Sequence, residues 1–211
     1  MESNGSPEHS LVQALAARDE GAFRELLRRH HAAIVRLART YVRTDAVAEE
    51  VAQETWAAVV AGIDRFEGRS SLKTWLFSIA VNRARTRAER EARSIPFSAL
   101  ATDADREDAP AVEDRFGADE RWSAPPRAWN DPERRLASLE LRDELKAALE
   151  DLPARQRLVV TLRDVEGLDP DEVCRVMDLA PGNERVLLHR GRTRLRAALE
   201  RSLDAALEPV G

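Results

Sequence analysis

The chain has 211 residues, of which 43% are hydrophobic and 34% charged, and its formal net charge is -5 at pH 7. This composition is typical of one folded domain or two small ones, and it excludes a chain that is disordered throughout. The longest uncharged apolar run, 57–63, is far too short to span a bilayer, and no signal-peptide pattern opens the chain, so we expect a cytoplasmic protein. The single cysteine, Cys174, excludes an internal disulfide and a cysteine-rich zinc site.

Charge divides the chain into segments more sharply than composition does. Residues 11–93 carry 15 basic and 11 acidic side chains, whereas residues 94–133 carry 4 basic and 10 acidic ones and hold five of the ten prolines. The second stretch shows no sustained helical period, which is typical of a linker. Trp122 and Trp129 are unusual for a disordered segment and suggest that this linker docks, either on its own domains or on a partner.

These patterns predict an all-α chain of two small helical domains joined by an acidic linker. The expected order is a disordered N-terminus at 1–10, a helical bundle at 11–93, the linker at 94–132, a helix-turn-helix domain at 133–203 and a C-terminal tail at 204–211.

Three amphipathic helices are predicted in the first domain. Apolar residues recur at spacings of three and four from about 22 to 42, from 46 to 61 and from 72 to about 90, and each apolar stripe needs a partner that buries it. Between the second and third helices lies a stretch with two glycines around Phe66, in which Ser70 is expected to cap the third helix. Beyond its first turns the third helix becomes basic, which favours a contact with nucleic acid.

The second domain is predicted to contain a helix-turn-helix. A helix over 153–165 precedes a short helix over 172–178, for which Asp169 is the expected N-cap and Glu172 completes a capping box. Pro181 ends that helix and allows another to begin at once. Short helices with a tight turn before a basic last helix are typical of a motif whose second helix docks in the major groove of DNA.

The last helix of this domain carries a marked concentration of positive charge. The stretch 185–196 holds five arginines and no acidic residue. On a helical wheel Leu188, Gly191 and Leu195 share one face, which is expected to be buried. Glu184 points toward the same face, but in the first helical turn it is expected still to reach water. Such a helix either contacts base edges and phosphates of DNA or is an ordinary solvated amphipathic helix.

Two groups of residues resemble bacterial sigma factors of the extracytoplasmic-function class. Ala48–Trp56, then Phe66 and then Lys73–Arg83 are similar to the second conserved region of that family. The C-terminal half is similar to its fourth region at Leu152–Pro153, Gln156–Arg157, Glu166–Leu168, Asp171–Val173 and Leu188–Arg192. Together the two similarities cover about 150 residues in the family's order, and two motifs in order are more specific than either alone.

The resemblance implies a protein that is not an enzyme and needs no cofactor or metal. It implies binding to core RNA polymerase, recognition of promoter DNA through two domains and help in separating the DNA strands. It also implies an anti-sigma factor that holds the protein inactive. The alternative is a conventional helix-turn-helix regulator that acts without joining the polymerase, although residues 11–93 show neither a ligand-binding nor a receiver pattern.

Three groups of contact residues follow from the resemblance. Core polymerase is expected to meet an acidic and amide patch on the second helix, which consists of Glu49, Glu50, Gln53 and Glu54. The opened strand of the downstream promoter element is expected to meet Phe66, Gly68, Arg69, Ser70, Ser71, Lys73, Asn82 and Arg83. The upstream promoter element is expected to meet Arg185, Val186, His189, Arg190, Arg192 and Thr193.

Some of these assignments have a structural alternative. The alternative for the acidic patch is a solvated charged face, and the alternative for Phe66 is a core residue. Trp56 and Trp75 are expected in the core. The chain departs from the pattern of the family at several positions in the helix-turn-helix: Cys174, Asp178, Glu184 and Leu187. These departures bear on the DNA sequence that the last helix reads more than on the helix itself.

Overall fold

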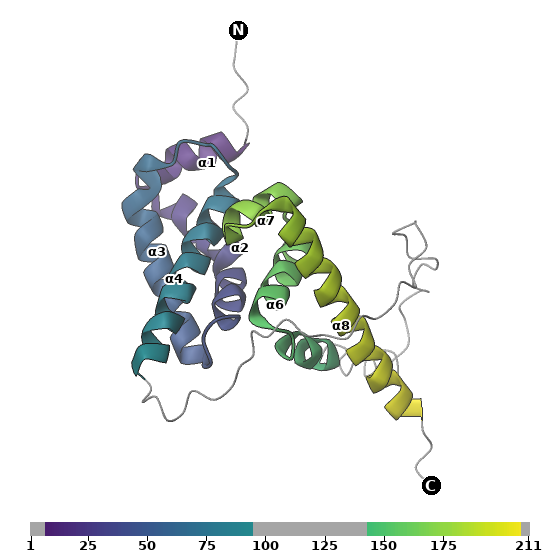
Figure 1. The fold of residues 1–211 in the computed structure, drawn as a ribbon. Helices are drawn as coiled ribbons and strands as arrows, with labels where there is room; N and C mark the ends of the chain where they lie inside the picture. The colour runs from purple at the N-terminus through teal and green to yellow at the C-terminus, as the bar shows by residue number, and fades with distance from the viewer. Residues whose placement is uncertain (1–6, 95–142, 208–211) are drawn as a thin grey trace, which may run out of the picture.

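The computed structural model describes residues 7–94 and 143–207, which are drawn in colour in Figure 1. Within these ranges the chain is helical and contains no strand, as the predicted all-α class requires. The expected linker at 94–132, including Trp122 and Trp129, lies almost entirely outside the described residues. None of the helices in the described ranges has the length and apolar character that a membrane-spanning helix needs.

The N-terminal bundle contains four α-helices and a short 3-10 turn. In chain order these are α1 (Pro7–Ala16), α2 (Glu20–Arg39), α3 (Asp45–Gly62), η1 (Ile63–Arg65) and α4 (Leu72–Ser94). Because α1 begins at Pro7, residues 7–10, which were expected to be disordered, are helical.

The core of this bundle lies where α2, α3 and α4 meet. Ile34, Val51 and Leu76, one from each helix, are essentially inaccessible to water, as are Leu37 and Phe77. Burying a side chain of this size stabilises the folded state by about 1.5–3 kcal/mol. The apolar spacing of three and four residues therefore predicted the correct faces of these helices.

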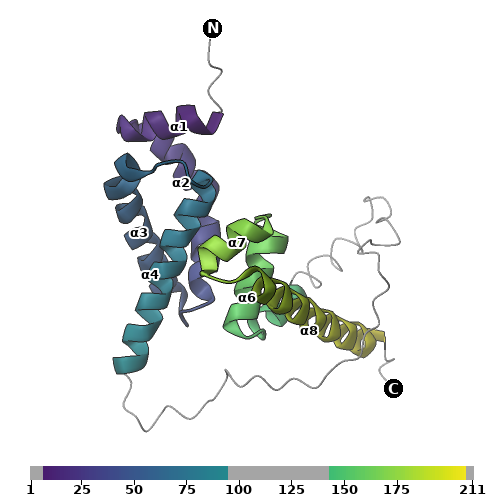
Figure 2. The ribbon, with the colours of Figure 1, turned by 45° about the horizontal axis from the view of Figure 1, so that its top comes forward.

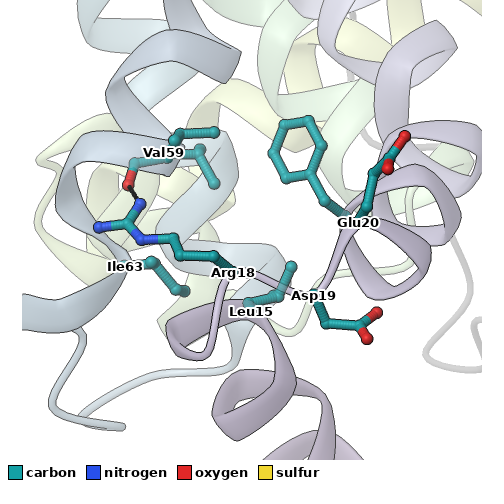
Figure 3. Close-up of a pocket in the computed structure, with 8 residues that line it drawn as sticks. Leu15, Arg18, Asp19, Glu20, Val59 and Ile63 are labelled. Atoms are coloured by element: carbon teal, nitrogen blue, oxygen red, sulfur yellow. Dashed lines mark hydrogen bonds between the residues drawn. The ribbon is translucent and has the colours of Figure 1, made fainter.

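Helix α1 is held to the bundle by Arg18, which adopts a left-handed backbone conformation with φ 62°. Its guanidinium donates to the carbonyl oxygen of Val60 and, at 2.7 Å, to Asp64 Oδ2. The arginine borders a mainly apolar hollow of about 220 Å³ between α1, α2 and the end of α3, seen in Figure 3. The lining residues that Figure 3 labels include Leu15, Val59 and Ile63.

Helix α4 is capped by Ser71, and the expectation that Ser70 caps it was wrong. The backbone N–H of Thr74 donates to Ser71 Oγ at 3.1 Å, which is the hydrogen bond of an N-cap side chain. The Ser70 hydroxyl instead donates to the carbonyl oxygen of Ser71 at 3.3 Å. The cap is thus one residue later than the sequence indicated.

The C-terminal domain contains helical residues 143–150 and four named elements: α6 (Ala154–Val160), η3 (Thr161–Val165), α7 (Pro170–Met177) and α8 (Pro181–Leu207). The helix expected over 153–165 is present, but its last part, η3, is a π-helical turn. The helical residues 143–150 were not predicted.

The predicted capping box at the start of α7 is confirmed. Asp169 accepts from the backbone of Glu172, and the Glu172 side chain accepts from the backbone of Asp169. At the other end of α7, Asp178 has φ 54° and ends the helix in a left-handed conformation. The short turn that follows leads directly into α8, as the sequence predicted.

Gly191 lets α8 pack unusually closely against α6. A Cβ atom placed on Gly191 would lie 2.7 Å from Val160 Cγ2 and 3.4 Å from the backbone oxygen of Gln156. Real Cβ atoms do not approach other atoms this closely, so the crossing of the two helices requires glycine at this position. In both views α8 extends away from the N-terminal bundle (Figures 1 and 2).

Glu184 is buried under the first turn of α8, and the expectation that it reaches water was wrong. Its exposed fraction is 2%, and its Oε1 lies 3.3 Å from Nε of Arg163 on η3. Arg163 is fixed in turn because its Nη1 donates to the carbonyl oxygen of Leu168 at 2.6 Å. The prediction that Glu184 points toward the core is correct. The helical wheel did not reveal its cationic partner, Arg163.

Replacing Gly191 with alanine is expected to destabilise the C-terminal domain by about 1–3 kcal/mol, because the added methyl group overpacks the crossing with α6. Gly182→Ala is the matched control, since nothing lies within 4 Å of its added Cβ on the same helix. Urea unfolding of the two variants checks this. Equal stability of both variants would contradict the close crossing.

Replacing Glu184 with glutamine is expected to lower the free energy of unfolding by about 2–3 kcal/mol, somewhat less than for a fully buried pair because Arg163 remains partly exposed. An apolar pair, Arg163→Met with Glu184→Leu, is expected to recover much of this loss, since neither partner is then left as an unpaired charge. A double-mutant cycle by urea unfolding measures the coupling. A coupling energy near zero would show that the pair does not hold α8.

Candidate functional site

The four residues of the acidic and amide patch all lie exposed on one side of α3. Glu49, Glu50, Gln53 and Glu54 face solvent, whereas Val51 and the other inward residues of this helix are buried. The patch predicted from spacing therefore exists as a continuous surface. Burial of the opposite side of α3 fixes its orientation.

This patch adjoins a row of basic side chains on α4. Glu50 Oε2 lies 2.7 Å from Nη2 of Arg87, and Glu54 Oε2 lies 3.6 Å from Nη1 of Arg83. Glu49 Oε2 lies 3.1 Å from Nε2 of His31. Exposed ion pairs of this kind contribute little to stability, so a cationic partner can replace them at small cost.

The loop between η1 and α4 presents an aromatic residue next to exposed polar ones. The ring centroid of Phe66 lies 5.3 Å from that of Trp75, and both side chains are half-buried. Gly68 has φ 69° and is exposed, as is Arg69, whose Nε lies 2.9 Å from Glu67 Oε2. Phe66 is thus packed on its Trp75 side without being fully buried, which is compatible with both alternatives considered for it.

Two residues assigned to the opened strand, both partly exposed, contact the C-terminal domain. The Ser71 hydroxyl donates to Glu172 Oε1 at 2.7 Å, and Lys73 Nζ donates to the backbone carbonyl oxygen of Glu166. Ser70 is half-buried beside them. The sequence did not predict either glutamate as a partner of this segment.

Asn82 and Arg83 lie farther along α4 and are exposed. Asn82 Oδ1 accepts from Arg85 Nη2 at 3.0 Å. Because Arg83 also faces Glu54, one residue assigned to the opened strand touches one assigned to core polymerase. The basic row of α4 therefore borders both predicted surfaces.

The solvent-facing side of α8 carries most of the residues predicted to contact the upstream promoter element. Arg185, Val186, His189 and Arg190 are exposed, with Val186 at 47%, and Thr193 is half-buried. Arg192 is also exposed, and its guanidinium binds both carboxylate oxygens of Asp164 at 2.7 and 3.1 Å. Asp164 thus fixes Arg192, a role that the sequence did not reveal.

Models of two conserved domains match the chain. Residues 26–94 match the description "Sigma-70 region 2", and residues 142–195 match "Sigma-70, region 4". The first match covers most of the N-terminal bundle, and the second covers the helix-turn-helix. A region 2 match in the N-terminal half is not what a conventional helix-turn-helix regulator would give.

Relatives of known class match nearly the whole chain. The ECF RNA polymerase sigma-E factor of Escherichia coli strain K12 is 31% identical over 182 residues, covering 86% of this chain and 88% of the relative. The RNA polymerase sigma-H factor of Pseudomonas aeruginosa is 30% identical over 207 residues, covering 96% and 95%.

Solved structures with the same fold include CnrH in complex with the cytosolic domain of CnrY, with a TM-score of 0.59 and 22% identity over 93% of this chain and 99% of that one. RpoE from Bartonella quintana in complex with the anti-sigma factor NepR gives a TM-score of 0.58 and 22% identity over 84% and 96%. The fold, the two domain matches and the full-length relatives agree, and the chain therefore belongs to the extracytoplasmic-function class of RNA polymerase sigma factors.

Proposed function

We propose that this sigma factor binds core RNA polymerase through the patch of Glu49, Glu50, Gln53 and Glu54 on α3. The observation that carries this assignment is the exposure of all four side chains on a helix whose other side is buried in the bundle core. Among the described residues, Glu50 and Glu54 pair with Arg87 and Arg83 of the same domain, whose side chains are partly exposed. A basic surface on the polymerase would replace those partners without leaving a buried charge unpaired.

The loop from Phe66 to Ser71 and the basic row of α4 are the proposed contacts with the opened promoter strand. An unstacked base needs an aromatic or apolar wall, which Phe66 and Trp75 provide. The phosphates of a single strand need cations, which Lys73 and Arg83 provide. Gly68 and Arg69 are exposed at the edge of that wall. The loop and α4 together thus combine the two kinds of group that single strands require.

The exposed side of α8 is the proposed contact with the duplex of the upstream element. Arg185 and Arg190 are placed to meet phosphates or guanine edges, while Val186 and His189 offer shorter contacts to bases. Arg192 is held by Asp164 and is preorganised on the flank of the same helix. Helix α8 would therefore enter the major groove as the second helix of a helix-turn-helix does.

Three further proposals follow from family membership. The protein acts in the cytoplasm, where transcription takes place, and contributes binding and positioning rather than catalysis. It is also held inactive by an anti-sigma factor. The last proposal is supported by the structural similarity to RpoE, which was solved in complex with the anti-sigma factor NepR.

Charge reversal in the patch, Glu50→Lys with Gln53→Lys, is expected to weaken binding to core polymerase by at least about thirtyfold, which is typical of a binding hot spot. The matched control is Glu20→Lys with Gln13→Lys, which makes the same charge change at exposed positions on α1 and α2. Fluorescence anisotropy with purified core polymerase measures both. Similar binding by the two variants would remove the patch from the interface.

Replacing Arg190 with alanine is expected to weaken promoter binding by the holoenzyme. It is also expected to reduce the slope of the logarithm of the binding constant against the logarithm of salt concentration by about the contribution of one phosphate contact. Arg201→Ala, an exposed arginine later in α8, is the control. Filter binding of promoter duplex over a range of salt concentrations measures the slope. An unchanged slope and affinity for Arg190→Ala would argue against α8 as the upstream contact.

A further inference from the structure

The acidic and amide patch on α3 contains one carboxylate, Glu49, whose neighbour is a histidine. Glu49 Oε2 lies 3.1 Å from Nε2 of His31 on α2. Within residues 7–94 the other two carboxylates of the patch, Glu50 and Glu54, instead face guanidinium groups on α4. An arginine always carries a positive charge, whereas an imidazole can be neutral. The protonation state of His31 therefore decides how much of the negative charge at Glu49 is offset.

The other edge of the His31 ring accepts a hydrogen bond from the bundle core. The indole Nε1–H of Trp56 donates to Nδ1 of His31 at 3.2 Å. Trp56 is only 6% exposed and packs edge to face against Phe23, with ring centroids 5.8 Å apart, so the direction of its N–H is fixed. An indole nitrogen can donate a hydrogen bond but cannot accept one. Nδ1 is therefore the unprotonated nitrogen of the imidazole.

This hydrogen bond selects one form of His31. A charged imidazolium, or a neutral ring with its proton on Nδ1, would point an N–H at the indole N–H of Trp56. The remaining form is neutral and carries its proton on Nε2, the nitrogen beside Glu49. The histidine thus offers Glu49 a neutral N–H, which attracts the carboxylate without cancelling its charge.

Glu49 stays accessible to a partner in this arrangement. The contact with His31 involves one carboxylate oxygen, Oε2, and the side chain of Glu49 remains 48% exposed. A side chain that is oriented before binding loses less conformational entropy when a partner binds it. In addition, a cation that approaches Glu50 must displace Arg87, whereas one that approaches Glu49 meets a neutral ring. Glu49 is therefore the carboxylate of the patch that attracts a basic surface most directly.

We propose that His31 is a positioning residue for the binding of core polymerase: the buried Trp56 holds it in the neutral Nε2–H form, and that N–H orients Glu49 as a charged contact for a basic surface. This inference rests on the proposed function of the patch, and it names Glu49 as the carboxylate through which His31 acts. The hydrogen bond joins α2 to α3 across 25 residues of chain, so no local pattern in the sequence indicates it.

The form of His31 is measured first, in the full chain at neutral pH, by ¹⁵N NMR, which distinguishes the two neutral forms of an imidazole and the imidazolium. The chain has four histidines, and His31→Asn identifies the signals of this one by their loss. We expect the Nε2–H form in the unaltered chain. Trp56→Phe keeps an aromatic ring but removes the indole N–H, and it is expected to add the Nδ1–H form. A proton on Nδ1 in the unaltered chain would overturn the proposal.

Binding of the full chain to purified core polymerase is measured next, by fluorescence anisotropy. An asparagine amide reaches the place of Nδ1 and a glutamine amide that of Nε2, so His31→Asn retains only the acceptor for Trp56 and His31→Gln only the donor for Glu49. We expect His31→Asn to bind about three- to tenfold more weakly than His31→Gln, the cost of ordering one freed side chain. His9→Asn, at an exposed histidine of α1, is the control and is expected to bind as the unaltered chain does. Equal affinity of the two His31 variants would overturn the proposal.

A double-mutant cycle separates action through Glu49 from any other role of His31. In a Glu49→Gln background, His31→Asn is expected to have no further effect on polymerase binding, and additive losses would overturn the positioning role. Thermal unfolding verifies that each variant is folded, and His31→Ala, which favours the helix, replaces His31→Asn in the cycle if the latter unfolds.

The same cycle distinguishes failure of this inference from failure of the proposed function. Unchanged binding by Glu49→Gln alone would remove Glu49 from the polymerase interface, and both would then fail at this residue. Weaker binding by Glu49→Gln without any loss for His31→Asn would overturn only the positioning role of His31.

Discussion

The Glu172 carboxylate joins the beginnings of two helices that belong to different domains, and the arrangement of the chain depends on it. One oxygen accepts from the backbone N–H of Asp169 and caps α7, while the other accepts from the Ser71 and Thr74 hydroxyls at the start of α4. Ser71 is itself the N-cap of α4. A single anion thus satisfies donors at two helix N-termini, where negative charge is favoured by the helix dipole. Any change that removes this anion affects the helix-turn-helix and the loop proposed to bind the opened strand together.

A second constraint determines how the basic helix is presented. Gly191 allows α8 to lie against Val160 at a distance that no other residue would permit, and the Arg163–Glu184 pair fixes its first turn. Both contacts are on the inner side of α8, so Arg185 and Arg190 are left on the outer side. In some proteins, though not in all, a buried ion pair contributes more to a defined geometry than to stability. Here its position under the first turn links it directly to the orientation of the residues proposed to read DNA.

The sequence predicted the elements of this fold well because each helix carries its own apolar period and several carry recognisable caps. It predicted the exposed patch on α3 for the same reason, since burial of Val51 and Trp56 leaves Glu50 and Gln53 on the opposite side. It did not predict what depends on long-range contacts. Arg36 and Glu166 are 130 residues apart in the chain, and no local pattern relates them. Glu184 was correctly directed inward but wrongly expected to reach water, because a helical wheel contains no information on the partner, Arg163, that the neighbouring element brings to it.

The central claim is that this chain directs core RNA polymerase to promoters by reading an upstream duplex with α8 and an opened strand with the loop before α4. The most direct measurement is transcription in vitro from fragmented genomic DNA with purified core polymerase, followed by sequencing of the RNA 5′ ends. The account predicts start sites that require this protein and that share two short upstream sequence elements at a fixed spacing, one for each domain. Start sites identical to those of core polymerase alone, or sharing no such pair of elements, would contradict it.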